Sequence, residues 1–252
     1  MTEPDPSVKP HPSTSPDRTA HALLAVHGLE AWYGESHILH GVDFNVLPGE
    51  VMTLLGRNGA GKTTTMRAIM GMVRARRGSV RFEDHELIKL PSNQIARLGI
   101  AFCPEERGIF ASLNVKENLL LPPEVRPGGL SVDQIFELFP NLYERLWSQG
   151  TKLSGGEQQM LAIARILRTG ARLLLLDEPT EGLAPVIIKQ IGRTIKSLKE
   201  KRFTILLVEQ NFRFASTVAD RFYVMEHGRV IDRFTVAELP TNMDKLHDYL
   251  GV

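Results

Sequence analysis

The eight residues from Gly56 to Thr63, GRNGAGKT, constrain the fold of this chain more than any other segment. They fit the pattern G-x-x-x-x-G-K-[ST], in which glycines let successive backbone N–H groups point at one anion. The apolar run Val51 to Leu55 precedes the loop, and Lys62 to Met72 has the pattern of a helix. A buried strand, a phosphate loop and a helix in this order predict an α/β nucleotide-binding fold.

The loop predicts a site for a nucleoside triphosphate with Mg²⁺, and by itself it does not say which nucleotide. Lys62 can reach the β- and γ-phosphates, and the Thr63 hydroxyl can bind the metal. A glycine-rich turn that merely joins strand to helix is the alternative, but every pattern position and both flanks match. The loop residues expected to contact the nucleotide are Gly56, Arg57, Asn58, Gly59, Ala60, Gly61, Lys62, Thr63 and Thr64.

Two adjacent acids follow a second apolar strand, Leu173 to Leu176. Neighbouring strand residues point to opposite faces, so the two carboxylates can take different roles beyond the strand end. We expect Asp177 to bind Mg²⁺ together with Thr63, and Glu178 to polarise the attacking water as general base. Acids that merely decorate a turn are the alternative, which the complete phosphate loop weakens.

Strands and helices alternate along the rest of the chain, which predicts a mainly parallel core sheet. Residues 1–21 contain five prolines among polar residues and are expected to form a disordered N-terminal extension. The folded domain is expected to span 22–252, with an inserted helical subdomain at approximately 91–165, where prolines punctuate short helical patterns. After it we expect helices at 155–168 and 186–200 and strands at 172–176 and 203–208.

Composition excludes several classes of protein. A net charge of +1 gives no basic field for nucleic acid, and no apolar run approaches the ~18 residues that cross a bilayer. We therefore expect a cytoplasmic protein whose membrane role depends on a partner.

Arg74, Arg76 and Arg77 are interpreted as cations at a helix end. The single cysteine, Cys103, is expected to be a buried strand residue rather than a reactive thiol.

The segment Leu153 to Gln159, LSGGEQQ, is the most discriminating one. Ser154 with Glu157 three residues later predicts a capping box at a helix start. Capping does not explain the two glycines between them, Gly155 and Gly156, which we expect to be exposed so that a phosphate can approach the backbone. This segment resembles the signature of ABC ATPases.

The resemblance implies that two ATP molecules lie between two subunits, each bound by one phosphate loop and the opposite signature. Ser154, Gly155, Gly156 and Glu157 are then expected to contact the nucleotide of another subunit. Tyr33 matches the aromatic residue that stacks on adenine. The resemblance covers nearly all of Leu23 to Val252, and it implies an N-terminal antiparallel β subdomain beside the parallel core.

Two positions depart from the common pattern of these ATPases. Glu105 stands where most members have a glutamine that senses the metal and water, so it is expected to contact Mg²⁺ or its water. Gln210 stands where most have a histidine that contacts the γ-phosphate, and its amide can donate a hydrogen bond but cannot carry a proton at neutral pH. Glu178 is then the expected general base.

Four further segments resemble the smaller ATP-binding subunit of bacterial branched-chain amino acid importers. They are PEERGIF at 104–110, VKENL at 115–119, EPTEGLAP at 178–185 and VEQN at 208–211. Urea and short-chain amide importers have very similar subunits. The resemblance implies a second ATP-binding subunit (identical or related), two integral-membrane permease subunits and, indirectly, an extracytoplasmic solute-binding protein. It also implies a location at the cytoplasmic face of the inner membrane.

Two other functions are compatible with parts of the pattern. A P-loop kinase would use the phosphate loop but has no use for LSGGEQQ. A non-transport ABC ATPase acting on ribosomes or DNA usually carries two cassettes or a long coiled coil, whereas this sequence has one cassette and no heptad run. The sequence therefore favours an ATPase that drives a transporter.

Overall fold

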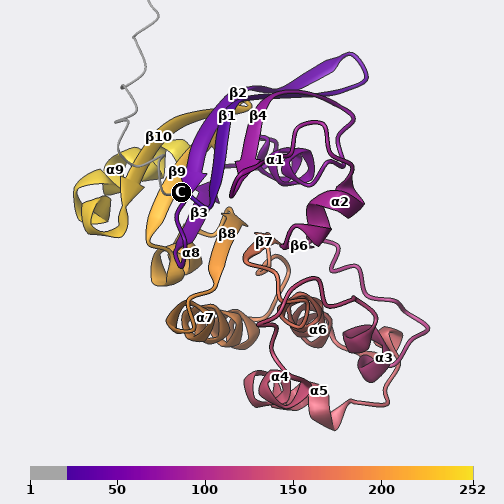
Figure 1. The fold of residues 1–252 in the computed structure, drawn as a ribbon. Helices are drawn as coiled ribbons and strands as arrows, with labels where there is room; N and C mark the ends of the chain where they lie inside the picture. The colour runs from indigo at the N-terminus through magenta and orange to yellow at the C-terminus, as the bar shows by residue number, and fades with distance from the viewer. Residues whose placement is uncertain (1–21, 252) are drawn as a thin grey trace, which may run out of the picture.

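The computed structural model describes residues 22–251 and contains two sheets (Figure 1). The predicted N-terminal extension, 1–21, lies outside the described residues. The first sheet is antiparallel, with strand order β2-β1-β4-β5. Its strands are β1 (Leu24–Tyr33), β2 (Ser36–Val46), β4 (Ala75–Phe82) and β5 (His85–Glu86).

The second sheet forms the core of the nucleotide-binding part. Its strands, in spatial order, are β10 (Arg229–Thr235), β9 (Arg221–Glu226), β3 (Val51–Leu55), β8 (Thr204–Glu209), β7 (Leu173–Asp177) and β6 (Ile100–Cys103). All adjacent pairs are parallel except β10 with β9. Every residue of β3, β7 and β8 is buried, as expected for central strands covered on both faces. The predicted mainly parallel core and the antiparallel N-terminal sheet are confirmed.

Alternate side chains of the core strands enter two different hydrophobic clusters. Met52 and Leu54 of β3 pack with the antiparallel sheet and α1 (Lys62–Ile69). Val51 and Leu55 pack on the other face with α6 (Gly155–Leu167), α7 (Pro185–Glu200), α8 (Phe212–Val218) and α9 (Leu239–Leu250). Burial of each such side chain contributes roughly 1.5–3 kcal/mol, so the sheet forms a rigid frame for the loops at its strand ends.

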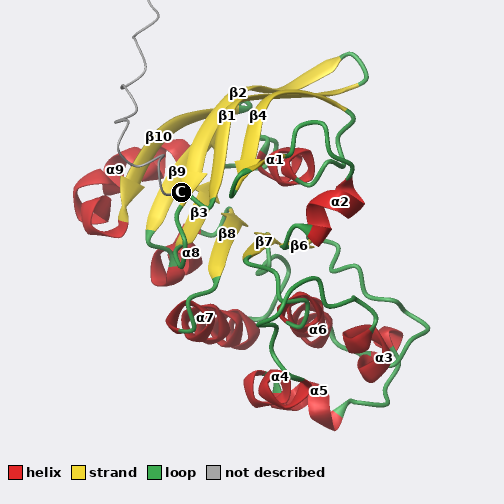
Figure 2. Ribbon diagram, in the orientation of Figure 1, coloured by secondary structure: helices red, strands yellow, loops and turns green. Residues whose placement is uncertain are grey.

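The remaining helices lie between β5 and β7 in the sequence. They are α2 (Ser92–Arg97), α3 (Val115–Leu120), α4 (Val132–Leu138) and α5 (Pro140–Glu144), and short 3₁₀ turns occur at Gly150–Lys152 and Val236–Glu238. Figure 2 shows α3, α4 and α5 gathered at the end of the molecule away from the antiparallel sheet. Within residues 22–251, none of the helices combines the length and the apolar character that crossing a bilayer requires.

Strand β6 falls inside the range 91–165 that the sequence assigns to the helical subdomain, yet it pairs with β7 in the core sheet. The helices that stand apart from the sheets therefore begin after Cys103. This cysteine is buried at the end of β6, as predicted, and burial raises the pKa of its thiol to about 12. The thiol thus stays protonated at neutral pH.

The interpretation of three arginines as cations at a helix end is wrong. Helix α1 ends at Ile69, and Arg76 and Arg77 belong to β4. The guanidinium of Arg76 donates hydrogen bonds of 2.9 to 3.1 Å to four backbone carbonyl oxygens, those of Ala68, Leu87, Ile88 and Leu90. Arg76 therefore joins the end of α1 to the segment after β5.

Candidate nucleotide site

The phosphate loop lies where β3 ends and α1 begins. Gly59 (φ +80) and Gly61 (φ +104) have left-handed backbone conformations that favour glycine. A Cβ on Gly61 would lie 2.9 Å from Cδ2 of Leu39, and one on Gly56 would lie 2.5 Å from the carbonyl oxygen of Met225. The loop therefore requires glycine, and the positive end of α1 behind it favours an anion.

Lys62 begins α1 and is buried inside the loop. Its Nζ donates hydrogen bonds to the carbonyl oxygens of Gly56 at 2.9 Å and Arg57 at 3.1 Å. The same nitrogen lies 2.9 Å from Oε1 of Glu178. The loop thus holds a desolvated ammonium group whose only charged partner among the described residues is Glu178.

Asp177 ends β7 beside the loop and is 1 % exposed. Its Oδ1 accepts a hydrogen bond from Oγ1 of Thr63 at 3.1 Å, whereas its buried Oδ2 has no hydrogen-bond partner. Burial raises the pKa of Asp177 to about 6, and the charges of Glu178 and Glu105 act in the same direction. An orphaned carboxylate oxygen next to a threonine hydroxyl is a donor set that fits Mg²⁺.

Glu178 follows the strand in an unusual backbone conformation, with φ +43. Its backbone N–H donates to the carbonyl oxygen of Val208 at 3.0 Å, which ties the turn to β8. The left-handed turn carries the side chain towards Lys62. Non-glycine residues in this conformation cluster at functional sites, because the surrounding structure must hold them there.

A cavity of about 420 Å³ lies beside the loop; Asp177 does not line it but accepts a hydrogen bond from Thr63, which does. The walls of the cavity are Ile38, Asn58, Gly59, Gly61, Lys62, Thr63, Thr64, Glu105, Glu178 and Glu181. The structure therefore brings Glu105 and Glu178 together with the phosphate loop. Ile38 and Glu181 were not predicted as site residues: Ile38 belongs to no motif, and Glu181 lies within the segment EPTEGLAP, which served only to indicate the family.

The carboxylates of Glu105, Glu178 and Glu181 face a single buried cation, Lys62, across this cavity. A triphosphate would add further negative charge at close range. A divalent cation at Asp177 would offset that charge, so the charge balance of the cavity agrees with the orphaned carboxylate oxygen.

Several predicted contact residues lie outside the walls of this cavity: Gly56, Arg57 and Ala60 of the loop, Ser154, Gly155, Gly156 and Glu157 of the α6 start, and Tyr33 and Gln210. Gln210 is exposed directly after β8. Tyr33 is 46 % exposed at the end of β1 and lines a neighbouring groove together with Arg67. Their contacts with nucleotide stay predictions.

The predicted capping box is present at the start of α6. Ser154 Oγ accepts the N–H of Glu157, and the Glu157 carboxylate accepts the N–H of Ser154 at 2.7 Å. The expectation that both glycines are exposed is wrong for Gly156, which is buried next to Ile187 of α7; a Cβ on Gly156 would lie 2.9 Å from that side chain. Gly155 is partly exposed, so it alone leaves the helix start open.

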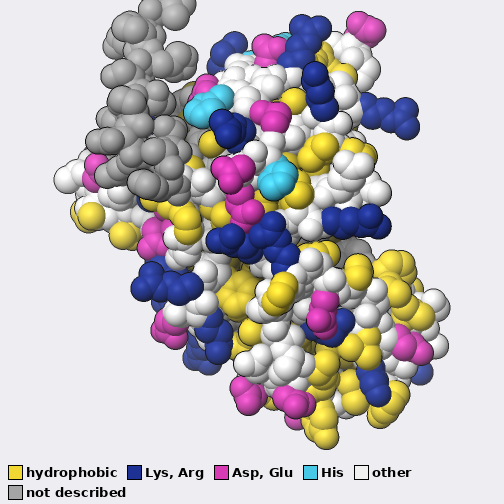
Figure 3. All heavy atoms as spheres, in the orientation of Figure 1, with side chains coloured by type: hydrophobic (Ala, Val, Ile, Leu, Met, Phe, Trp, Pro, Cys, Tyr) yellow, Lys and Arg dark blue, Asp and Glu magenta, His cyan; other side chains and the backbone are white. Residues whose placement is uncertain are grey.

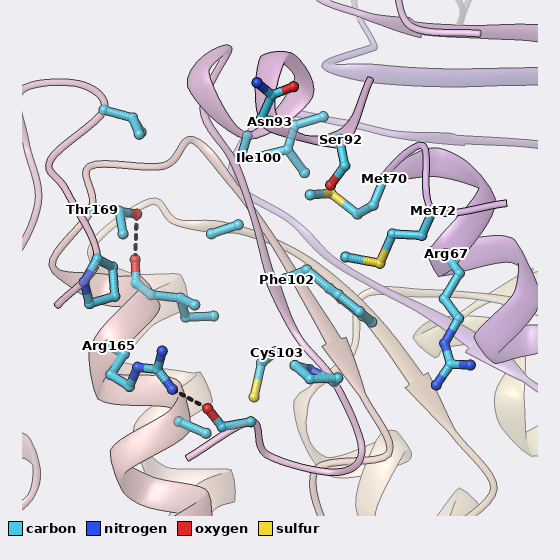
Figure 4. A pocket seen from close by; sticks show the side chains of 18 of the residues that line it. Arg67, Met70, Met72, Ser92, Asn93, Ile100, Phe102, Cys103, Arg165 and Thr169 are labelled. Carbon is cyan, nitrogen blue, oxygen red and sulfur yellow. Dashed lines mark hydrogen bonds between the residues drawn. The ribbon is translucent and has the colours of Figure 1, made fainter. Parts of the chain in front are cut away.

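A second, larger groove of about 880 Å³ runs between the core and the helical part. Figure 4 shows that Met70, Met72, Ile100 and Phe102 point into it, with Arg67 at one side and Arg165 at the other. Arg67 pairs with Glu106 at 2.8 Å. The buried Nε atoms of Arg107 and Arg165, which also line the groove, have no hydrogen-bond partner within residues 22–251.

On the face drawn in Figure 3, hydrophobic side chains gather over the helical part of the molecule. The large exposed hydrophobic residues in and beside α3 and α5 are Leu120, Leu121, Tyr143 and Trp147. Surfaces of this kind often mark protein contacts.

The family model described as ABC transporter matches residues 39–181. A curated relative from Pseudomonas aeruginosa, the high-affinity branched-chain amino acid transport ATP-binding protein BraG, is 44% identical over 238 residues, covering 91% of this chain and 100% of that protein. A relative from Archaeoglobus fulgidus, the probable branched-chain amino acid transport ATP-binding protein LivF, is 37% identical over 224 residues, covering 86% and 94%.

Solved structures have the same fold. One, described as the ATP binding subunit of an ABC transporter, is 29% identical and superposes with a TM-score of 0.76, covering 91% of this chain and 100% of that chain. The residues matched by the family model, 39–181, include the phosphate loop, the capped start of α6, Asp177 and Glu178.

Proposed function

The chain belongs to the ABC transporter family, and we propose that it is the ATP-hydrolysing subunit of an importer of branched-chain amino acids. It binds ATP and couples hydrolysis to transport, as this family of ATPases does. The observation that carries the hydrolytic part is that Lys62, Thr63 and Glu178 line one cavity, with Lys62 paired to Glu178 and Thr63 donating a hydrogen bond to Asp177 behind it. The 44% sequence identity with BraG, which extends over that protein's whole length, supports branched-chain amino acids as the cargo.

We propose that Lys62 and the backbone of the phosphate loop bind the β- and γ-phosphates. Thr63 and Asp177 would hold Mg²⁺, with Glu105 near it, and the metal would offset phosphate charge. Arrival of the γ-phosphate gives Lys62 a new anionic partner, which frees the Glu178 carboxylate. Glu178 then accepts a proton from a water whose oxygen attacks the γ-phosphorus, while the bond to the β-phosphate oxygen breaks and ADP leaves.

The start of α6 is proposed to serve a second subunit, identical or related. Ser154, Gly155 and Glu157 do not line the cavity at the chain's own phosphate loop. A capped helix start with one open glycine is suited to an anion brought by another molecule. Tyr33 is proposed to stack on adenine, and Gln210 to donate a hydrogen bond to the γ-phosphate.

The permease subunits are proposed to dock in the groove beside Arg165. Its apolar walls suit a hydrophobic segment, and Arg107 and Arg165 suit a carboxylate on that segment. The groove is lined by Pro104 and Glu106, the neighbours of Glu105, so a movement of Glu105 on closure of the nucleotide site would be transmitted to a segment bound in the groove. This arrangement would place the chain at the cytoplasmic face of the inner membrane, with the solute-binding protein on the other side.

The cargo is tested by uptake in a strain that lacks this subunit. We expect loss of leucine, isoleucine and valine uptake, restored by the wild-type chain but not by Glu178→Gln. Lost uptake of urea or short-chain amides with normal leucine uptake would instead assign one of those solutes.

A further inference from the structure

We infer that Glu209 is a positioning residue of the ATPase, whose buried carboxyl group joins the turn that follows Glu178 to the segment that carries Gln210. Glu209 is the last residue of β8, one position before Gln210. The inference rests on the proposed function, because it concerns the same hydrolytic site.

Both carboxyl oxygens of Glu209 accept hydrogen bonds from the loops beside it. Oγ1 of Thr180 donates to Oε1 at 2.8 Å, and the backbone N–H of Asn211 donates to Oε2 at 3.1 Å. Glu209 is 2 % exposed and Thr180 is 5 % exposed, so water does not compete for these bonds. One carboxyl group therefore connects the loops that follow β7 and β8.

The loop after β7 carries the expected general base. Thr180 lies two residues beyond Glu178. The backbone N–H of Glu178 also donates to the carbonyl oxygen of Val208, the residue before Glu209. The Glu178 turn is thus fixed to β8 at one end by a backbone bond and at the other by the Thr180 hydroxyl.

The loop after β8 carries the expected γ-phosphate contact. Asn211 follows Gln210 and accepts the N–H of Phe214 at 3.1 Å as the N-cap of α8. The bond from the Asn211 N–H to Glu209 therefore fixes the backbone on the far side of Gln210. Movement of either loop would be transmitted to the other through the Glu209 carboxyl group.

The electrostatic surroundings of Glu209 argue against a purely structural acid. Glu209 pairs with Leu55 of β3, which is apolar. Its neighbour at the start of α8 is the neutral Asn211, and its neighbour in the loop after β7 is the acidic Glu178. No lysine, arginine or histidine within residues 22–251 forms an ion pair with it. Burial, together with the charge of Glu178, raises the pKa of Glu209 to about 7. A buried acid without a cationic partner lowers the stability of the fold when it is ionised, and acids of this kind are typical of functional sites.

The test compares three substitutions in the full chain with Mg-ATP. In Glu209→Gln the amide oxygen can still accept one hydrogen bond, but the NH₂ group cannot accept the N–H of Asn211. We expect kcat to fall about tenfold while KM for ATP changes less than about twofold, because small misplacements of reacting groups act on turnover. Thr180→Val should have the same effect, and Thr180→Ser, which keeps the hydroxyl, should restore kcat to within about twofold.

Thr204→Val is the matched control. Thr204 begins the same strand, is 3 % exposed, and its Oγ1 accepts the N–H of Gly49 at 2.9 Å. We expect this variant to melt at a lower temperature with normal kcat. Equal loss of kcat in the control would overturn the inference. So would normal kcat in Glu209→Gln and Thr180→Val while Glu178→Gln is inactive, and the proposed function would then still stand. Turnover by Glu178→Gln would overturn the proposed function instead.

Discussion

The ammonium nitrogen of Lys62 lies 2.9 Å from Oε1 of Glu178, and the two side chains are only 3 % and 10 % exposed. The residue expected to bind phosphate is thus paired with the residue expected to activate water. A nucleotide that takes over Lys62 must break this pair, because the ammonium group also holds two backbone carbonyls of the loop. Binding of the γ-phosphate and release of the general base are therefore linked by one cation.

Replacing Asp177 tests the metal site. In Asp177→Asn the orphaned oxygen loses its charge, so we expect the Mg²⁺ concentration for half-maximal ATPase activity to rise at least about tenfold. The melting temperature without nucleotide should not fall, because a desolvated carboxylate is removed. Asp84→Asn, at an exposed position, is the control and should leave both values unchanged. An unaltered Mg²⁺ requirement in Asp177→Asn would show that the metal lies elsewhere.

The two glycines of the α6 start should respond differently to alanine. In Gly156→Ala the new Cβ would lie 2.9 Å from Ile187, and we expect a loss of about 1–3 kcal/mol in unfolding free energy. In Gly155→Ala the nearest neighbour is the flexible end of Arg107 at 3.4 Å, so folding should be preserved while ATPase activity of the assembled transporter falls. Denaturant unfolding and phosphate release measure the two effects. Full ATPase activity in Gly155→Ala would argue against a nucleotide contact there.

The titration of Glu209 predicts a pH-dependent stability. Its pKa is raised from 4.5 to about 7 in the folded chain, so the folded state binds the proton more tightly. Protonated Glu209 therefore stabilises the folded state. This contribution is complete below the pKa of the unfolded chain, 4.5, and is lost as the pH rises through the pKa of the folded chain, about 7. Between pH 6 and pH 8 the wild type should lose about 1 kcal/mol more unfolding free energy than Glu209→Gln. Urea unfolding at the two pH values measures this difference, and parallel losses in both proteins would contradict it.

Local patterns predicted most of the candidate site. The glycines, Lys62 and Thr63 lie within one loop, and the capping box of Ser154 and Glu157 spans four consecutive residues, so spacing alone reveals them. The parallel core followed from the alternation of apolar strands with helices. Each of these features is formed by residues close together in the sequence, so it can be recognised from a single sequence.

Contacts between distant segments could not be predicted in this way. Thr180 and Glu209 are separated by 29 positions, and nothing in either segment indicates that their side chains meet. Gly156 was expected to be exposed because the packing of α7 over α6 is invisible in the sequence. The role of Arg76 was mistaken for the same reason, since its four carbonyl partners are assembled only by the fold.

The central claim is that Glu178 activates the attacking water and that Lys62 holds the γ-phosphate. ATP hydrolysis and ATP binding by Glu178→Gln test it together, with Glu181→Gln as the control at the same cavity. We expect Glu178→Gln to lose at least about a hundredfold in turnover. It should bind ATP as tightly as the wild type or more so, because Lys62 then has no anionic partner among residues 22–251. Turnover within about twofold of the wild type would contradict the account.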